Sequence, residues 1–180
     1  MKKRLQITHE DFFRSMANMI AASKRVTMAI AKTKKKPAFF YTIGNQEKQL
    51  PELLIIGNFN TQDICNTLNI LSDKMLQRLA TFGPLNSHFK EEELVSLGGE
   101  YPLLIYSASK DAKEKYTFQA GQFYANEDYN VMQVVIPDRK GCYPPDPRCH
   151  KDYQVPVLKE GKDGKKADGP GADQKIKGQG

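Results

Sequence analysis

The chain has 180 residues and a formal net charge of +6, and this length predicts one domain. Leu, Ile, Val and Phe supply 41 of the 180 residues, which is enough apolar material for a core and excludes a wholly disordered chain. The longest apolar runs, such as residues 53–56, are far shorter than the ~18 residues that span a bilayer, so we expect no membrane association.

Targeting signals and cysteines indicate the compartment. Residues 8–11 are polar at the point where a secretory signal peptide would be apolar. Three cysteines are too few, and odd in number, for the disulfide framework of a small extracellular domain. We therefore expect a reduced, cytoplasmic protein.

Positive charge is concentrated at the ends of the chain. Residues 1–36 contain ten Lys or Arg against two acids, whereas residues 37–158 carry a net −4 and residues 159–180 a net +2. A basic arm could bind nucleic acid by neutralising several phosphates together. The residues that would do so are Lys2, Lys3, Arg4, Lys34, Lys35 and Lys36. The alternative is that the internal lysines form a solvated turn.

The first segment of the chain predicts a helix and two strands. Thr8, with Asp11 three residues later, is typical of a helix cap, and apolar residues then recur at helical spacing over residues 9–23. Residues 26–31 and 38–43 have the alternating, β-branched and aromatic composition of strands.

A central strand and a long helix follow. Residues 53–56 are a continuous apolar run between a proline and a glycine, which is typical of a strand buried on both faces. Apolar residues then step by three or four over residues 61–82. This pattern predicts a helix that Asn60 begins and Gly83 ends.

The second half of the chain predicts two more strands and one more helix. The strands cover residues 103–106 and 130–136, and the helix between them is capped by Ser109 and extends to Phe123. Residues 85–100 predict a loop or a weak edge strand.

We expect three parts: an N-terminal basic arm and amphipathic helix over residues 1–24, an α+β domain over residues 25–158, and a disordered basic Gly, Lys and Asp tail over residues 159–180. The domain is expected to be a mixed β-sheet packed by about three helices, with an extended proline-rich segment over residues 137–158. If the strands flanking each helix lie in one sheet, the two β-α-β crossovers should be parallel and right-handed.

Several short motifs occur in a fixed order. They are Tyr41-Thr42-Ile43-Gly44, Pro51-Glu52-Leu53 with Gly57, Leu68-Asn69, Gln133-Val134-Val135-Ile136-Pro137-Asp138 with Gly141 and Pro144, and Tyr153-Gln154-Val155-Pro156-Val157-Leu158. Their order resembles that of the domain of unknown function 4262 family over roughly residues 25–158. The resemblance implies a fold rather than a function, and a small cytosolic protein of a bacterium or phage. This chain departs from the family in having Ile136 before Pro137, where an aromatic is common, and in having no Trp.

Polar residues within these motifs suggest a catalytic pocket. Glu52 and Asp138 are the carboxylates, and Tyr41, Thr42 and Gln133 are polar positions within otherwise apolar strands. If the strands are neighbours, these side chains could converge on a pocket where one carboxylate acts as a base. The alternative is that both carboxylates stabilise turns at strand ends and that Gln133 satisfies backbone groups.

Two strand-to-helix junctions suggest a ligand site of a different kind. One carries Asn60, and the other carries Ser109 and Lys110. If the sheet brings the junctions side by side, their free N–H groups could bind an anion such as phosphate. Helix capping alone is the alternative.

Cysteine and histidine residues near the C-terminus suggest a metal site. Cys142, Cys149 and His150 could supply three ligands to zinc, but structural zinc normally has four, with a shorter gap between paired cysteines. We therefore expect no metal and no cofactor. Adjacent residues such as Cys149 and His150 rarely face one another, so they do not predict a nucleophile and its base.

No motif in the sequence specifies a reaction. We expect a non-enzymatic interaction protein, encoded by a phage or mobile element, that binds and modulates a host macromolecule, with protein favoured over nucleic acid as partner. One alternative is a nucleotide or other phosphate-containing small-molecule binding protein, or a hydrolase that uses the carboxylate pocket. The second alternative is nucleic-acid binding through the basic N-terminal arm.

Overall fold

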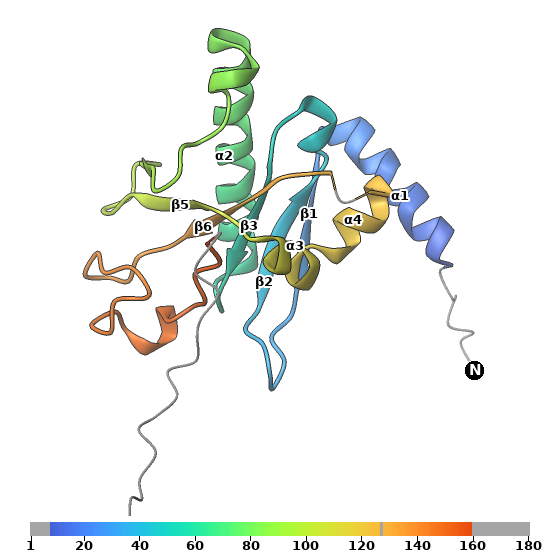
Figure 1. Cartoon of the computed structure of the whole chain (residues 1–180). Coiled ribbons are helices and arrows are strands. Elements are labelled where there is room, and N and C mark those ends of the chain that lie inside the picture. Colours follow the sequence, from blue (N-terminus) through green and yellow to red (C-terminus); the bar gives the residue numbers. More distant parts are fainter. Residues whose placement is uncertain (1–7, 127, 160–180) are drawn as a thin grey trace, which may run out of the picture.

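A mixed six-stranded sheet in the order β1-β2-β3-β6-β5-β4 forms the centre of the fold (Figure 1). The computed structural model describes residues 8–126 and 128–159. The strands are β1 (Val26–Ile30), β2 (Phe39–Ile43), β3 (Glu52–Ile56), β4 (Leu94–Val95), β5 (Leu103–Ser107) and β6 (Val131–Val135). The helices in this part of the chain are α1 (His9–Ser23), α2 (Thr61–Phe82), α3 (Lys110–Tyr116) and α4 (Phe118–Tyr124). The predicted α+β class and mixed sheet are confirmed.

Helices cover both faces of the sheet, so the fold has three layers. Leu53 and Ile55 of β3 pack with α2 in one apolar cluster. Leu54 and Ile56 of the same strand pack with α1, α3 and α4 in the other. Figure 1 shows α2 and α1 on opposite sides of the central strands. The continuous apolar run of β3 is therefore explained by burial on both faces.

Helix α2 follows the predicted apolar pattern. Its residues Ile64, Leu68, Leu71, Ser72 and Met75 are buried against the sheet. The Asn60 side chain accepts hydrogen bonds from the backbone N–H groups of Gln62 and Asp63, at 2.9 and 3.2 Å. The helix ends before Gly83, which has a φ of 77°. Both the cap and the C-terminal glycine act as the sequence predicts.

The predicted parallel crossovers are wrong. Only β3 and β6 pair in parallel among the described strands, and β5 is antiparallel to β6. The edge strand β4 enters the sheet after α2 and pairs antiparallel with β5, so it reverses the chain before β5 begins. Ser107 pairs with Met132, so residues 108–130 leave and re-enter the sheet at the same edge.

The single helix predicted after Ser109 is divided in two. Thr117 has φ −122° and ψ 30°, which is not helical. Its hydroxyl donates to the carbonyl of Lys113 at 2.8 Å, and its own carbonyl accepts from the Tyr129 hydroxyl at 3.1 Å. These contacts hold the break between α3 and α4, which a helical pattern in the sequence does not reveal.

The proline-rich segment after β6 crosses the face that carries α1 and α4. Val155 and Leu158 pack against that apolar cluster, and Lys159 forms a bridge with Ala108 beyond the end of β5. The predicted disordered tail lies outside the described residues apart from Lys159, as do Lys2, Lys3 and Arg4. No helix in the described ranges is both long enough and apolar enough to cross a membrane.

Candidate functional site

A cleft of about 570 Å³ lies beyond the carboxyl ends of the two parallel strands. β3 leads there into residues 57–60 and then α2, while β6 leads into the loop that begins at Pro137. The cleft is lined by Asn58, Phe59, Arg139, Lys140, His150 and Tyr153, together with Asp138, Arg148 and Asp152. In open α/β sheets, ligands bind in the crevice outside the carboxyl ends of strands. This is the same position in the fold.

Asp138 organises the loop that forms one wall of the cleft. One carboxylate oxygen accepts hydrogen bonds from the backbone N–H groups of Lys140 and Cys142, at 2.8 and 2.9 Å. The other accepts from the N–H of His150 at 2.8 Å. These hydrogen bonds lower the pKa of Asp138. The bond from the N–H of His150 makes the largest contribution to the shift. Asp138 therefore acts as a turn-stabilising carboxylate, which is the alternative that the sequence left open.

The Asp138 carboxylate is expected to make the loop sensitive to acid. Because its pKa is lowered in the folded state from an ordinary 3.8, ionised Asp138 contributes stability above that pH. The contribution is lost as the pH falls through the folded-state pKa. Thermal melts should show wild type more stable than Asp138→Asn at neutral pH, with the difference shrinking below about pH 3.8. A difference that grows as the pH falls would contradict this assignment.

Positive side chains lie on the solvent side of the same loop. Arg139 and Lys140 are exposed, and no ion pair within residues 8–126 and 128–159 involves either of them. Arg148 is held by Asp146 through contacts of 3.0 Å from Nε and 2.6 Å from a terminal nitrogen. The cleft is therefore lined by three cations and the carboxylates of Asp138 and Asp152, and the first of these carboxylates is occupied by backbone donors.

Two aromatic side chains, Phe59 and Tyr153, also line the cleft, and we call them its aromatic wall. The rings of Phe59 and Tyr153 lie 5.7 Å apart between centroids, and Tyr153 lies 6.5 Å from the His150 ring. Phe59 and Tyr153 are both partly exposed. The cleft thus combines an aromatic wall with a cationic one.

Glu52 lies at the other end of β3 and is completely buried. Its carboxylate accepts from the Thr42 hydroxyl at 2.6 Å, from the backbone N–H groups of Gly44 and Gln46 at 3.1 and 3.0 Å, and from the Tyr124 hydroxyl. Burial raises the pKa of Glu52, and these hydrogen bonds oppose that shift. β3 and β6 are parallel, so Glu52 and Asp138 lie at opposite edges of the sheet and do not form one pocket.

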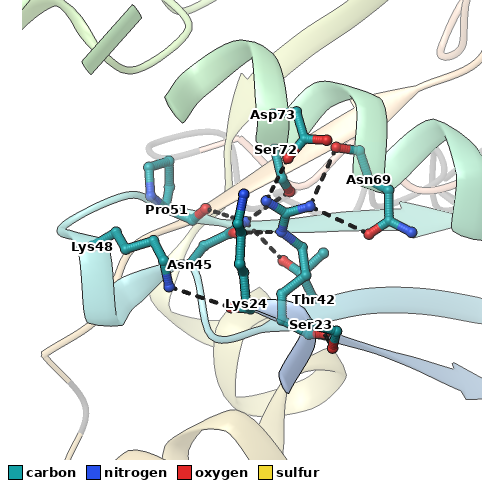
Figure 2. A network of polar contacts seen from close by, with 10 residues as sticks. Ser23, Lys24, Thr42, Asn45, Lys48, Pro51, Asn69, Ser72 and Asp73 are labelled. Atoms are coloured by element: carbon teal, nitrogen blue, oxygen red, sulfur yellow. Dashed lines mark hydrogen bonds and ion pairs between the residues drawn. The ribbon is translucent and has the colours of Figure 1, made fainter. Parts of the chain in front are cut away.

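A buried polar network continues from Thr42 to α2 (Figure 2). The Asn45 amide donates to the Thr42 hydroxyl at 3.2 Å and to Ser72 at 3.0 Å. Its oxygen accepts from Arg25 at 3.2 Å, and Arg25 reaches Asp73 at 2.8 Å. The side-chain donors and acceptors of this network are satisfied internally. The contacts of this network join β2, the 44–51 turn and α2. We therefore assign the network a structural role.

The remaining polar strand residues also have internal partners. The amide of Gln133 donates to the carbonyl of Pro156 at 2.7 Å, and its oxygen accepts from the N–H of Leu158 at 2.8 Å. The Tyr41 hydroxyl donates to the side chain of Gln119. Gln133 therefore satisfies the backbone of the C-terminal segment, as the sequence alternative proposes.

The two strand-to-helix junctions do not meet. Asn60 follows β3, whereas Ser109 and Lys110 follow β5, which runs in the opposite direction. The junctions therefore lie at opposite edges of the sheet. The Ser109 hydroxyl caps α3 by accepting from the N–H of Ala112 at 3.3 Å, and Lys110 lies 3.9 Å from Glu114.

Cys142, Cys149 and His150 lie in the loop that Asp138 organises. The buried Cys149 thiol donates to the carbonyl of Cys142 at 3.3 Å, and burial raises the pKa of both thiols. The His150 ring accepts from the N–H of Asp152 at 3.3 Å. No group of three or more His, Cys, Asp and Glu side chains in the described ranges is placed to hold a metal ion.

Two surfaces are candidates for contact with a macromolecular partner, one formed by the lysines that the sequence predicts and one by apolar residues that only the structure shows to be exposed. Lys34, Lys35 and Lys36 are exposed in the turn between β1 and β2, at the edge of the sheet where β3 ends, because Phe39 pairs with Ile56. Exposed Phe82 and Leu94 line a shallow groove at the other end of α2. Nothing in the described ranges identifies a partner for either surface, so both hypotheses stay predictions.

Most of the residues that line the cleft cannot be identified from the sequence. No pattern in the sequence marks Arg139, Lys140, Arg148 or Phe59 as site residues, and Tyr153 occurs only within a family motif. Two sequence features could have indicated the cleft. Gly57 directly follows the apolar run of residues 53–56, and the Pro137-Asp138 turn follows the strand predicted over residues 130–136. Their meeting depends on the parallel pairing of β3 and β6, which the sequence does not specify.

These features define the class of protein: an α+β domain with a mixed six-stranded sheet and a cleft where its two parallel strands end. The family model described as "Domain of unknown function (DUF4262)" matches residues 19–150. The chain belongs to this family, as the motifs predict. No curated protein and no solved structure matches it.

Proposed function

We propose that the chain binds a phosphate-bearing small molecule in the cleft beside Asp138. The observation that supports this function is the position of Arg139 and Lys140, which are exposed at the rim of a cavity of about 570 Å³. Small-molecule sites usually have volumes of ~300–1,000 Å³. Lysine and arginine side chains are the usual ligands of phosphate oxygens.

The loop geometry supports binding by a preformed site. Asp138 fixes the backbone of Lys140, Cys142 and His150 through three hydrogen bonds, so the cations project from a segment with a defined conformation. A preorganised loop loses less conformational entropy on binding than a flexible one. This function is the phosphate-ligand alternative that the sequence leaves open, but we propose different residues for it.

Partner-protein binding, which the sequence favours, has weaker support. It would use exposed apolar side chains such as Phe82 and Leu94, and scattered exposed apolar residues are common on monomeric proteins. The cleft combines positive charge, a volume suited to a small molecule and a position at the carboxyl ends of β3 and β6. For this reason we favour small-molecule binding over partner-protein binding.

Titration calorimetry with pyrophosphate tests the proposed function. The double variant Arg139→Ser/Lys140→Ser should bind pyrophosphate at least about tenfold more weakly than wild type, because each hydrogen bond to a charged group contributes ~1.5–3 kcal/mol and about 1.4 kcal/mol is a factor of ten.

The matched control is Arg14→Ser/Lys90→Ser, which removes the same charge from exposed positions outside the cleft. It should bind pyrophosphate like wild type. Equal weakening by both double variants would indicate a general effect of net charge and would contradict a site at the cleft. Absence of pyrophosphate binding to wild type would also overturn the proposed function.

A further inference from the structure

The phosphate site proposed at Arg139 and Lys140 does not use the aromatic wall of the cleft. The rings of Phe59 and Tyr153 are tilted relative to each other, with centroids 5.7 Å apart and an interplanar angle of 54°. Both line the cleft, and both remain partly exposed. An exposed aromatic surface beside cations suits a ligand with a flat ring at one end and a negative charge at the other.

The backbone is shaped to place Phe59 on this wall. Gly57 has a φ of +146°, and a Cβ at this position would lie 2.2 Å from the Phe59 ring. The ring therefore packs directly over the glycine backbone at the end of β3. A larger residue at position 57 would exclude the ring from this place, so the wall depends on a glycine that directly follows a buried strand.

Polar side chains also line the cleft. The Asn58 oxygen accepts from the N–H of Ala38 at 3.2 Å, which orients the amide and leaves its nitrogen as a donor at the cleft. The exposed Asp152 carboxylate lies 3.5 Å from the His150 ring. A carboxylate accepts hydrogen bonds from sugar hydroxyls and from exocyclic amino groups.

We propose that the ligand of the cleft is a nucleotide, with its base against Phe59 and Tyr153 and its phosphate at Arg139 and Lys140. This inference rests on the proposed function and adds the class of ligand. A cavity of about 570 Å³ lies within the size range of sites for such molecules. Asn58 and Asp152 lie where the sugar or the base edge would be.

The test compares ligands that differ only in the base. Calorimetry is performed on the full chain with AMP, GMP, CMP and UMP, and with ribose phosphate as the ligand that lacks a base. At least one nucleotide should bind about tenfold or more tightly than ribose phosphate, because stacking of a base on an aromatic side chain contributes an affinity factor of that size.

Two variants separate the aromatic wall from the cationic one. Tyr153→Leu keeps an apolar side chain and should weaken nucleotide binding about tenfold more than it weakens pyrophosphate binding. Phe59→Leu should do the same and provides an independent check if the first variant alters the loop. Circular dichroism confirms that each variant is folded.

The outcomes distinguish the nucleotide from the proposed function. If pyrophosphate binds but no nucleotide binds more tightly than ribose phosphate, the nucleotide inference is wrong and the phosphate site stands. If neither binds, both are wrong. If an RNA oligonucleotide binds far more tightly than any mononucleotide and this depends on Lys34, Lys35 and Lys36, nucleic-acid binding replaces the nucleotide inference.

Discussion

Replacing Glu52 by alanine is expected to lower the free energy of unfolding by about 3–5 kcal/mol. The carboxylate is completely buried and accepts hydrogen bonds from Thr42, Gly44, Gln46 and Tyr124. Alanine would leave an unfilled space and deprive the hydroxyl and amide donors of their acceptor. Denaturant unfolding followed by circular dichroism measures the loss.

The control for this variant is Glu47→Ala. Glu47 is an exposed glutamate in the turn that follows Asn45, and its removal should change stability by less than about 0.5 kcal/mol. A loss below about 1 kcal/mol for Glu52→Ala would mean that the carboxylate does not hold β2, β3 and α4 together. Glu52→Gln, which keeps the side-chain volume and one acceptor, should lose less than the alanine variant.

Gly57→Ala is expected to have the second-largest effect, because it changes both stability and the cleft. The φ of +146° is a conformation that L side chains rarely adopt, and such strain costs on the order of 1–3 kcal/mol. The added Cβ would also lie 2.2 Å from the Phe59 ring. The ring must move, so the aromatic wall would be displaced.

The exposed Gly99 is the matched control for Gly57. A Cβ at Gly99 would meet no atom closer than 3.9 Å, and the φ of Gly99 is not positive. Gly99→Ala should therefore leave the melting temperature within a few degrees of wild type, whereas Gly57→Ala should lower it clearly. Equal melting temperatures for the two variants would show that the conformation at Gly57 is not required.

Most elements of the fold could be predicted because each depends on local patterns. The apolar spacing and the end signals of α2 are local, and so is the apolar run of β3. The pairing of strands is different. The order of the sheet depends on the two-residue strand β4, whose sequence is barely distinguishable from a loop, and this strand sets the direction of β5.

The candidate site could be predicted only in part for the same reason. Glu52 and Thr42 do come together, because β2 and β3 are consecutive antiparallel strands. The sequence predicts Asp138 and Glu52 in one pocket, but Asp138 lies at the opposite end of the strands and accepts from backbone N–H groups. The cations of the Asp138 loop fall in the segment that the sequence predicts only as extended and proline-rich. They line a cleft with Phe59 because β3 and β6 end at the same edge.

The measurement that tests the central claim most directly is an NMR titration of ¹⁵N-labelled protein with pyrophosphate, in which the amide chemical shifts are monitored. A phosphate site in the cleft predicts saturable shifts concentrated in residues 57–61 and 138–153, at the carboxyl ends of β3 and β6. The amides around Glu52, Ser109 and Phe82 should remain unchanged. Shifts concentrated in the turn at residues 32–37 or around Ser109, or no saturable shift at all, would contradict the claim.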